Sequence, residues 1–149
     1  RRQIGVIFQD FKLLPKKTLA ENVAFALQVC GKSNKKINAV VPQLMKIVGL
    51  SEQMDRYPHE VSGGEQQRTA IARALVYQPK ILLADEPTGN LDSINAEEII
   101  ELLQKINKFG TTVILVTHNR EIVNNLNRRV LTISDGKLVS DQAKGKYLI

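Results

Sequence analysis

The stretch VSGGEQQRTAIARALVYQPKILLADEPTGNLD, residues 61 to 92, carries the strongest fold signal in this chain. Ser62 and Glu65 have the S-x-x-E spacing of a capping box, which predicts that a helix begins after Ser62. Gly63 and Gly64 carry no Cβ atom, so a group from outside could approach the amides of the first turn. Unpaired amides and the positive end of the helix dipole favour an anion there. A nucleotide phosphate would suit this position.

A short apolar run, ILLA at 81–84, follows that helix, which we expect to end near Gln78 before Pro79. The run leads into Asp85 and Glu86, and it is typical of a buried parallel strand with acids at its carboxyl edge. Ligands bind at that edge in open α/β sheets. Because neighbouring strand residues point to opposite faces, we expect Asp85 to face Mg²⁺ through water and Glu86 to face an attacking water. Together the two motifs indicate ATP chemistry.

The rest of the chain alternates strand and helix patterns, which favours an α/β fold with a parallel sheet. Thr18 and Glu21 form another capping box ahead of an apolar helical rhythm. Asp135 and Gly136, between VLTIS and KLVS, give the strongest hairpin signal. No apolar run reaches transmembrane length. We expect strands at 3–9, 81–84 and 112–117, helices at 18–30, 34–48 (ended by Gly49), 62–78, 93–108 and 119–126, and a short helical turn at 51–58.

Charge and cysteine content limit the possible partners. The chain has a net charge of +6, and between residues 11 and 60 eight basic residues outnumber four acids. A solvated helix surface would explain this excess, and so would an anionic membrane, near which each basic residue gains about 1 kcal/mol. Aromatic residues make up 5% of the chain, which disfavours nucleic acid as a partner. Cys30 is the only cysteine in the sequence, so neither a disulfide framework nor a thiolate metal site is predicted.

Five motifs occur in the order typical of one family. VSGGEQQR resembles the ABC signature, ILLADEP resembles Walker B with its following glutamate, and GNLD at 89–92 resembles the D-loop. Gln9, at the end of IGVIFQ, takes the Q-loop position, and His118, after TTVILVT, takes that of the switch histidine. The chain is therefore similar to the nucleotide-binding domains of ABC transporter-type ATPases. The resemblance implies an incomplete P-loop NTPase (RecA-like) core at 1–10 and 63–149, with an inserted helical subdomain at 11–62.

One family motif, the glycine-rich Walker A loop between a strand and a helix, is not found. The family places this loop upstream of the Q-loop, where eight residues precede Gln9. ALQVCGKS, residues 26–33, fits a relaxed form of the motif, but the capped helical pattern ahead of it makes Gly31 a helix-ending residue. We therefore expect this sequence by itself to be inactive and its sheet to leave apolar surface uncovered.

The family mechanism implies a role for each motif residue. Two such domains would close head to tail around two ATP molecules, with Ser62, Gly63, Gly64 and Glu65 contacting the nucleotide held by the partner. Val61 and Glu65 depart from the commoner leucine and glutamine, and the second change affects a possible ribose contact. Asp85 would bind Mg²⁺, and Gln9 would contact the nucleotide-bound metal and the attacking water. Glu86 would act as general base, and His118 would contact the γ-phosphate. Asp92 would communicate across the dimer, and it could also cap a helix beginning at Ser93.

The segment IGVIFQDFKLLPKKTLAENVAFAL, residues 4–27, resembles the ATP-binding subunits of bacterial cell-division ABC complexes. The DEPTGNLD form is shared with lipoprotein-releasing and macrolide-export ATPases, which are the alternatives. The resemblance implies an integral membrane subunit and a second nucleotide-binding domain as partners, at the cytoplasmic face of the bacterial inner membrane. A fragment that only docks on a membrane partner is a further alternative. DNA-organising ABC ATPases are disfavoured because they need long coiled-coil insertions.

Overall fold

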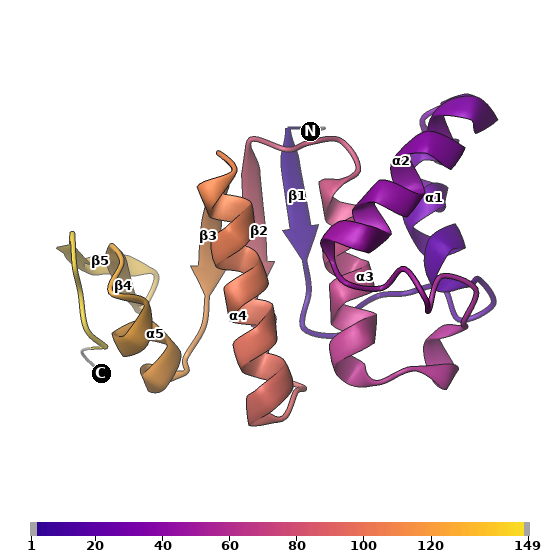
Figure 1. Cartoon of the computed structure of the whole chain (residues 1–149). Helices are drawn as coiled ribbons and strands as arrows, with labels where there is room; N and C mark the ends of the chain where they lie inside the picture. Colours follow the sequence, from indigo (N-terminus) through magenta and orange to yellow (C-terminus); the bar gives the residue numbers. More distant parts are fainter. Residues whose placement is uncertain (1–2, 148–149) are drawn as a thin grey trace. The chain divides into compact units, whose positions relative to one another are not determined.

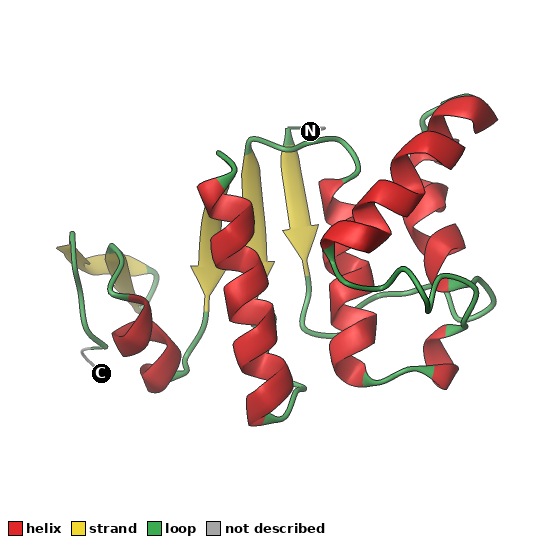
Figure 2. Cartoon of the chain, viewed as in Figure 1, coloured by secondary structure: helices red, strands yellow, loops and turns green. Residues whose placement is uncertain are grey.

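The computed structural model describes residues 3–147, in two compact units that comprise residues 3–116 and 117–147. Within these residues, the first unit holds a parallel sheet with α-helices, and the second holds one helix and a hairpin (Figures 1 and 2). The predicted boundary of a helical subdomain at 11–62 falls inside the first unit and stays a prediction. The elements of the first unit are β1 (Ile4–Ile7), α1 (Leu19–Val29), α2 (Asn34–Ile47), the 3₁₀ helix η1 (Pro58–Glu60), α3 (Gly63–Leu75), β2 (Ile81–Asp85), α4 (Ser93–Lys108) and β3 (Thr112–Val116).

The sheet of the first unit has the strand order β1-β2-β3, and both pairings are parallel. Ile7 lies beside Ala84, and Ala84 lies beside Leu115, so the carboxyl ends of the strands meet at one edge. Parallel neighbours need crossover connections, which α1 to α3 supply between β1 and β2 and α4 supplies between β2 and β3. The predicted α/β class with a parallel sheet is confirmed.

The two faces of this sheet differ in their cover. Ile7, Leu82 and Ala84 are buried, and they share the face against which α3 and α4 pack; Figure 1 shows α4 crossing in front of the sheet. Alternate residues of the strands point the other way, because side chains on a strand alternate between faces. The opposite face therefore carries exposed apolar side chains, which confirms the prediction of uncovered apolar surface. They are Ile4, Val6, Ile114 and Val116.

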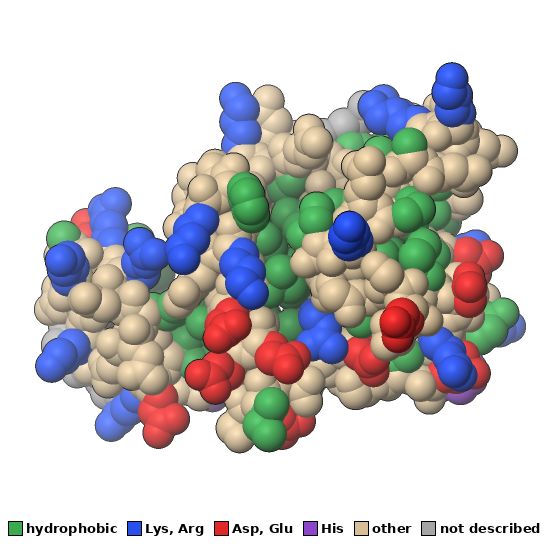
Figure 3. All heavy atoms as spheres, in the orientation of Figure 1, with side chains coloured by type: hydrophobic (Ala, Val, Ile, Leu, Met, Phe, Trp, Pro, Cys, Tyr) green, Lys and Arg blue, Asp and Glu red, His purple; other side chains and the backbone are tan. Residues whose placement is uncertain are grey.

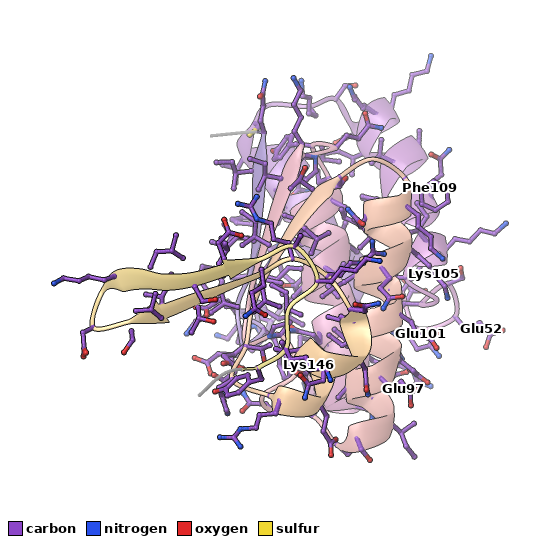
Figure 4. The ribbon with its side chains drawn as sticks, turned by 90° about the vertical axis from the view of Figure 1, so that its left-hand side faces the viewer. Glu52, Glu97, Glu101, Lys105, Phe109 and Lys146 are labelled. Atoms are coloured by element: carbon purple, nitrogen blue, oxygen red, sulfur yellow. The ribbon has the colours of Figure 1, made fainter. Side chains whose placement is uncertain are left out.

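The two sides of α4 are chemically different, as expected for a helix that packs on a sheet. Ile99, Leu103 and Ile106 are buried. Figure 4 shows Glu97, Glu101 and Lys105 one turn apart along an exposed side, and Figure 3 shows acidic side chains over the lower half of this helix with basic ones above them. Acids near the start of a helix and bases near its end complement the helix dipole. The predicted bounds of this helix, 93–108, are confirmed.

The end of α1 decides how the GKS segment is interpreted. Gly31 has a φ of +67°, which places it in the left-handed region. Its N–H donates to the Gln28 carbonyl at 2.9 Å, and the Lys32 N–H donates to the Leu27 carbonyl at 3.1 Å. This is the Schellman pattern of a helix terminus. Ser33 then caps α2, so the prediction that Gly31 ends a helix is confirmed.

The segment 51–58 differs from the expected helical turn, and that prediction was wrong. It forms bends and turns, and only Pro58–Glu60 is helical, as η1. The cause is a competing set of hydrogen bonds. The Leu19 N–H donates to the Arg56 carbonyl at 2.8 Å, and the Ala20 N–H donates to the Met54 carbonyl at 3.0 Å. Two carbonyls of this segment thus satisfy the free amides at the start of α1.

The helix that follows the signature motif, α3, ends three residues earlier than expected. Its last residue is Leu75, and Gln78 already has a φ of +49° with its N–H bonded to the Leu75 carbonyl at 2.8 Å. Gln78 precedes Pro79, and the residue before a proline is disfavoured in the helical region. Pro79 therefore accounts for the departure of Gln78 from the helical region.

The second unit consists of α5 (Arg120–Leu126), β4 (Val130–Ser134) and β5 (Lys137–Gln142). Asp135 and Gly136 join the two strands with φ values of +50° and +72°, as a two-residue hairpin turn requires. The hairpin prediction is confirmed, and an ion pair at 2.7 Å joins Arg129, just before β4, to Asp141 of β5. Across residues 3–147, none of the helices combines the length and apolar character needed to cross a bilayer.

Candidate nucleotide-binding site

The start of α3 is capped as the sequence predicts. The Ser62 Oγ accepts from the Glu65 N–H at 3.2 Å, and the Glu65 Oε2 accepts from the Ser62 N–H at 2.8 Å. The same Oε2 also accepts from the Ser62 hydroxyl at 2.9 Å. The Glu65 carboxylate is therefore engaged with its own helix cap. Its negative charge lies at the end of the helix where an anion would bind, and it partly offsets the positive dipole there.

Atoms of the same chain lie close to where a Cβ would be on each of the two signature glycines. From the sequence alone, we expect this space to be open to a group from outside. A Cβ on Gly63 would lie 3.3 Å from the Leu91 Cδ2 atom. A Cβ on Gly64 would lie 2.7 Å from Asn95 Cγ, and the Asn95 Oδ1 would be closer still. Gly64 is buried. The space beside its Cα is thus filled by Asn95 of α4, and the approach of an outside group to the amides of this turn stays a prediction.

The acids after the central strand do not both belong to it. Asp85 is the last residue of β2 and is exposed, whereas Glu86 lies beyond the strand with a φ of +45°. The Glu86 N–H donates to the Val116 carbonyl at 2.9 Å, and its carbonyl accepts from the Gly89 N–H at 3.1 Å. The turn, rather than the alternation of a strand, therefore sets the direction of Glu86. A non-glycine residue held in the left-handed region is strained, and such strain concentrates at functional sites.

Gln9 and the D-loop lie together at the carboxyl edge of the sheet. The Gln9 Nε2 donates to the Asn90 Oδ1 at 3.2 Å, and the Asn90 Nδ2 donates to the Gln9 carbonyl at 3.2 Å. A Cβ on Gly89 would lie 2.7 Å from the Gln9 Nε2, so this glycine allows the glutamine to lie across the loop. The bond uses the amide nitrogen of Gln9 and leaves its side-chain oxygen outside this pair.

Asp92 caps α4, which confirms one of its two expected roles. Its Oδ1 accepts from the Asn95 N–H at 2.9 Å, and its Oδ2 accepts from the Asn95 side-chain amide at 2.6 Å. The backbone bond first, and then the side-chain bond, hold the pKa of the Asp92 carboxyl below its usual value. Hydrogen bonds to the charged form of a carboxyl favour that form.

Two residues of α3 that sequence reasoning did not single out hold the loops of this site. Gln67 is fully buried, and its Nε2 donates to the Pro87 carbonyl at 2.6 Å and to the Phe8 carbonyl at 3.4 Å. It thereby joins the residue before Gln9 to the residue after Glu86. The signal for Gln67 was its place three and four residues before Ala70 and Ile71, on the buried side of the helix.

The second such residue is Arg73, whose guanidinium holds the segment after Gln9. It donates to the Lys12 carbonyl at 2.7 Å and to the Phe11 carbonyl at 2.9 Å. Phe11 and Lys12 have φ values of +50° and +51°, so a left-handed pair of residues is fixed by a side chain from α3. Burial lowers the pKa of Arg73. No local pattern in the sequence indicates these contacts.

His118 belongs to the second unit, where it is exposed and precedes the Asn119 cap of α5. The Asn119 side chain accepts from the Glu121 N–H at 2.9 Å and the Ile122 N–H at 3.2 Å. The γ-phosphate contact of His118 stays a prediction. The first unit brings together the remaining residues: Gln9, Ser62, Gly63, Gly64, Glu65, Asp85, Glu86 and Asp92.

The side chains at the carboxyl edge of the sheet include oxygen donors of the kind that Mg²⁺ prefers. Residues 3–147 contain no group of three His, Cys, Asp or Glu side chains placed to hold a metal. Mg²⁺ does not require such a group, because it keeps several waters and binds one or two carboxylates together with substrate phosphates. Asp85 at the end of β2 supplies one exposed carboxylate, and Gln9, just beyond β1, supplies an amide oxygen at the same edge. These residues fit a metal that is held mainly by a nucleotide.

Comparison with known proteins shows the family to which this chain belongs. A family model described as ABC transporter matches residues 1–89. Over 147 residues, 99% of this chain, the sequence is 53% identical to the cell division ATP-binding protein FtsE of Streptococcus pneumoniae and 54% identical to that of Mycobacterium tuberculosis. It is 46% identical over 142 residues, 95% of the chain, to the methionine import ATP-binding protein MetN 1 of Burkholderia lata. The chain spans 64% of the length of the FtsE relatives and 41% of this MetN.

Proposed function

Because the chain belongs to the ABC transporter family, we propose that the protein carrying it is an FtsE-like ATP-binding subunit that hydrolyses ATP and acts on a membrane partner. One observation supports the assignment to the FtsE subfamily. Identity to FtsE is 53–54% in two organisms over 99% of the chain, against 46% to MetN over 95%. The lipoprotein-releasing and macrolide-export types, proposed from DEPTGNLD alone, rest on a shorter segment.

The geometry of the first unit supports different roles for its residues in ATP hydrolysis. Glu86, held by its turn beyond β2, would act as general base or orient the attacking water. Asp85 and the side-chain oxygen of Gln9 would hold Mg²⁺, which when bound neutralises phosphate charge. His118 would contact the γ-phosphate. The groups of the first unit would thus serve the nucleotide on their own protomer.

The start of α3 would serve the nucleotide of the other protomer. Gly63 and Gly64 would present the free amides of the first turn, next to the Ser62 cap, to a phosphate held by a second nucleotide-binding domain. Glu65, engaged with Ser62, would act mainly by fixing this turn. Asp92 would relate the two sites across the dimer.

A groove beside the Q-loop is the proposed contact with an FtsX-like integral membrane subunit. Its volume is about 320 Å³, and Arg73 fixes its wall at Phe11 and Lys12. Its lining combines apolar and charged groups, which suits the apolar core and polar rim of a protein interface. The lining residues are Asp10, Phe11, Lys12, Leu13, Pro15, Pro58, His59 and Gln66.

We place the protein at the cytoplasmic face of the bacterial inner membrane as a peripheral subunit. The excess of basic residues between 11 and 60 supports an additional contact with anionic lipid.

Copurification with the membrane subunit tests the docking groove. Lys12→Glu, in the groove, should reduce it, whereas Lys46→Glu, an exposed charge reversal on α2, should not.

Genetic replacement separates the two ABC subtypes. The complete protein should restore division in a strain depleted of FtsE, and it should not restore methionine import in a strain that lacks MetN. The opposite result would reject the FtsE-like assignment.

The 149-residue chain is proposed to be inactive by itself. Micromolar ATP affinity in a nucleotide titration of this chain would contradict that proposal.

A further inference from the structure

The start of α3 lies against the D-loop and the start of α4 at three successive positions. Gly63 faces the Leu91 side chain, Gly64 faces Asn95, and one turn further Arg68 pairs with Glu98 at 2.5 Å. The first turn of the signature helix therefore contacts both the D-loop and the first turn of the helix that follows it. Among these positions, the one at Gly64 is the tightest.

Asn95 is held in place from both sides. Its side-chain amide donates to the Asp92 Oδ2 at 2.6 Å, and its backbone N–H donates to Oδ1 at 2.9 Å. Its Cγ and Cβ atoms lie 2.7 Å and 3.2 Å from where a Cβ on Gly64 would be. The side chain cannot turn away from position 64 without losing its bond to Asp92. An atom added at position 64 would therefore displace Asn95, Asp92 or the helix itself.

We propose that Asn95 is a positioning residue that locks the D-loop to the first turn of the signature helix, and that Gly64 is glycine in order to admit it. This rests on the proposed function for its effect on catalysis. Packing against Asn95 thus explains the need for glycine at position 64 without any contact to nucleotide. It also joins Asp92, which would act across the dimer, to the turn that would bind the partner's nucleotide.

A double-mutant cycle in the complete protein, measured without nucleotide, tests the contact. Gly64→Ala should lower Tm by on the order of 5 °C, because overpacking is costly. Adding Asn95→Ala removes the two nearest atoms and should restore at least half of that loss. If the double variant is no more stable than Gly64→Ala, or does not fold, the proposal is overturned.

Gly63→Ala is the matched control for this cycle. It adds the same atom to the same helical turn, but its nearest neighbours are the Leu91 Cδ2 at 3.3 Å and the Phe11 Cζ at 3.6 Å, which are ends of flexible side chains. Gly63→Ala should change Tm little, and Asn95→Ala should not improve it. A rescue of equal size at position 63 would show a general gain from alanine and would overturn the specific contact.

Kinetics of Asn95→Asp test the positioning role. Aspartate keeps the shape of the side chain but replaces the donor that faces Asp92 with an acceptor. We expect kcat to fall about tenfold with KM within about twofold, since the ATP-holding residues are untouched. An unchanged kcat would overturn the positioning role. Absence of ATP hydrolysis in the unaltered protein would overturn the proposed function, while Tm would still decide the contact.

Discussion

Two groups of glycines in this chain are needed for different physical reasons. Gly31 and Gly49 end helices with φ values of +67° and +72°, and no atom lies within 4 Å of where a Cβ would be. Gly5 and Gly64 need no left-handed backbone, but a Cβ on Gly5 would lie 2.8 Å from the Ala74 carbonyl oxygen. The first group serves backbone conformation and the second serves packing. The reason for a glycine in a motif that resembles a phosphate-binding one therefore depends on the atoms around it.

The largest effect is expected for Gly5→Ala in β1. The added atom would meet the backbone of α3, which cannot rotate away as a side chain can. We expect a loss of about 3 kcal/mol in the free energy of unfolding, measured by chemical denaturation of the complete protein. Val6→Ala, on the exposed face of the same strand, should cost much less. Equal losses at the two positions would show that packing is not what requires Gly5.

A smaller effect is expected for Gly31→Ala at the end of α1. Alanine fits the open space, so only the left-handed backbone is penalised, by about 1 kcal/mol. Gly31→Asn should lose less than Gly31→Ala, because asparagine tolerates this conformation better. The measurement is the same denaturation experiment. A loss as large as that of Gly5→Ala would remove the distinction between the two groups.

The smallest effect is expected from the Asp92 cap that holds Asn95 against Gly64, and it depends on pH. The pKa of Asp92 is lower in the folded protein than its usual value, so its contribution to stability is complete above the unfolded-state pKa. That contribution is lost as the pH falls through the lowered, folded-state pKa. Asp92→Asn should therefore reduce the acid dependence of Tm, whereas Glu97→Gln, on the exposed side of α4, serves as the control. An acid dependence unaltered by Asp92→Asn would contradict the cap.

Local signals predicted most of this fold. Capping boxes at Thr18 and Ser62, the helix end at Gly31 and the turn at Asp135 all depend on neighbouring residues, and the structure confirms each of them. The segment 51–58 could not be predicted in this way. Its carbonyls bond to amides of α1, more than 30 residues away in the sequence.

The sequence offered candidate residues for the site but not the contacts between them. Motif order indicated Gln9, Asp85, Glu86 and Asp92, and the structure brings them into one unit. The bonds from Gln9 to Asn90 and from Gln67 to Pro87, and the contact of Asn95 with Gly64, join segments that are distant in sequence. Such contacts exist only once the sheet has aligned its strand ends.

The most direct test of the account is ATP hydrolysis by the complete protein and its Glu86→Gln variant, with ATP binding measured in parallel. Glutamine keeps the size of Glu86 but cannot accept a proton, so binding should persist while turnover falls by about 100-fold or more. Glu97→Gln, an exposed change on α4, should hydrolyse ATP as the unaltered protein does. Turnover that persists in Glu86→Gln would contradict the role assigned to the residue after β2.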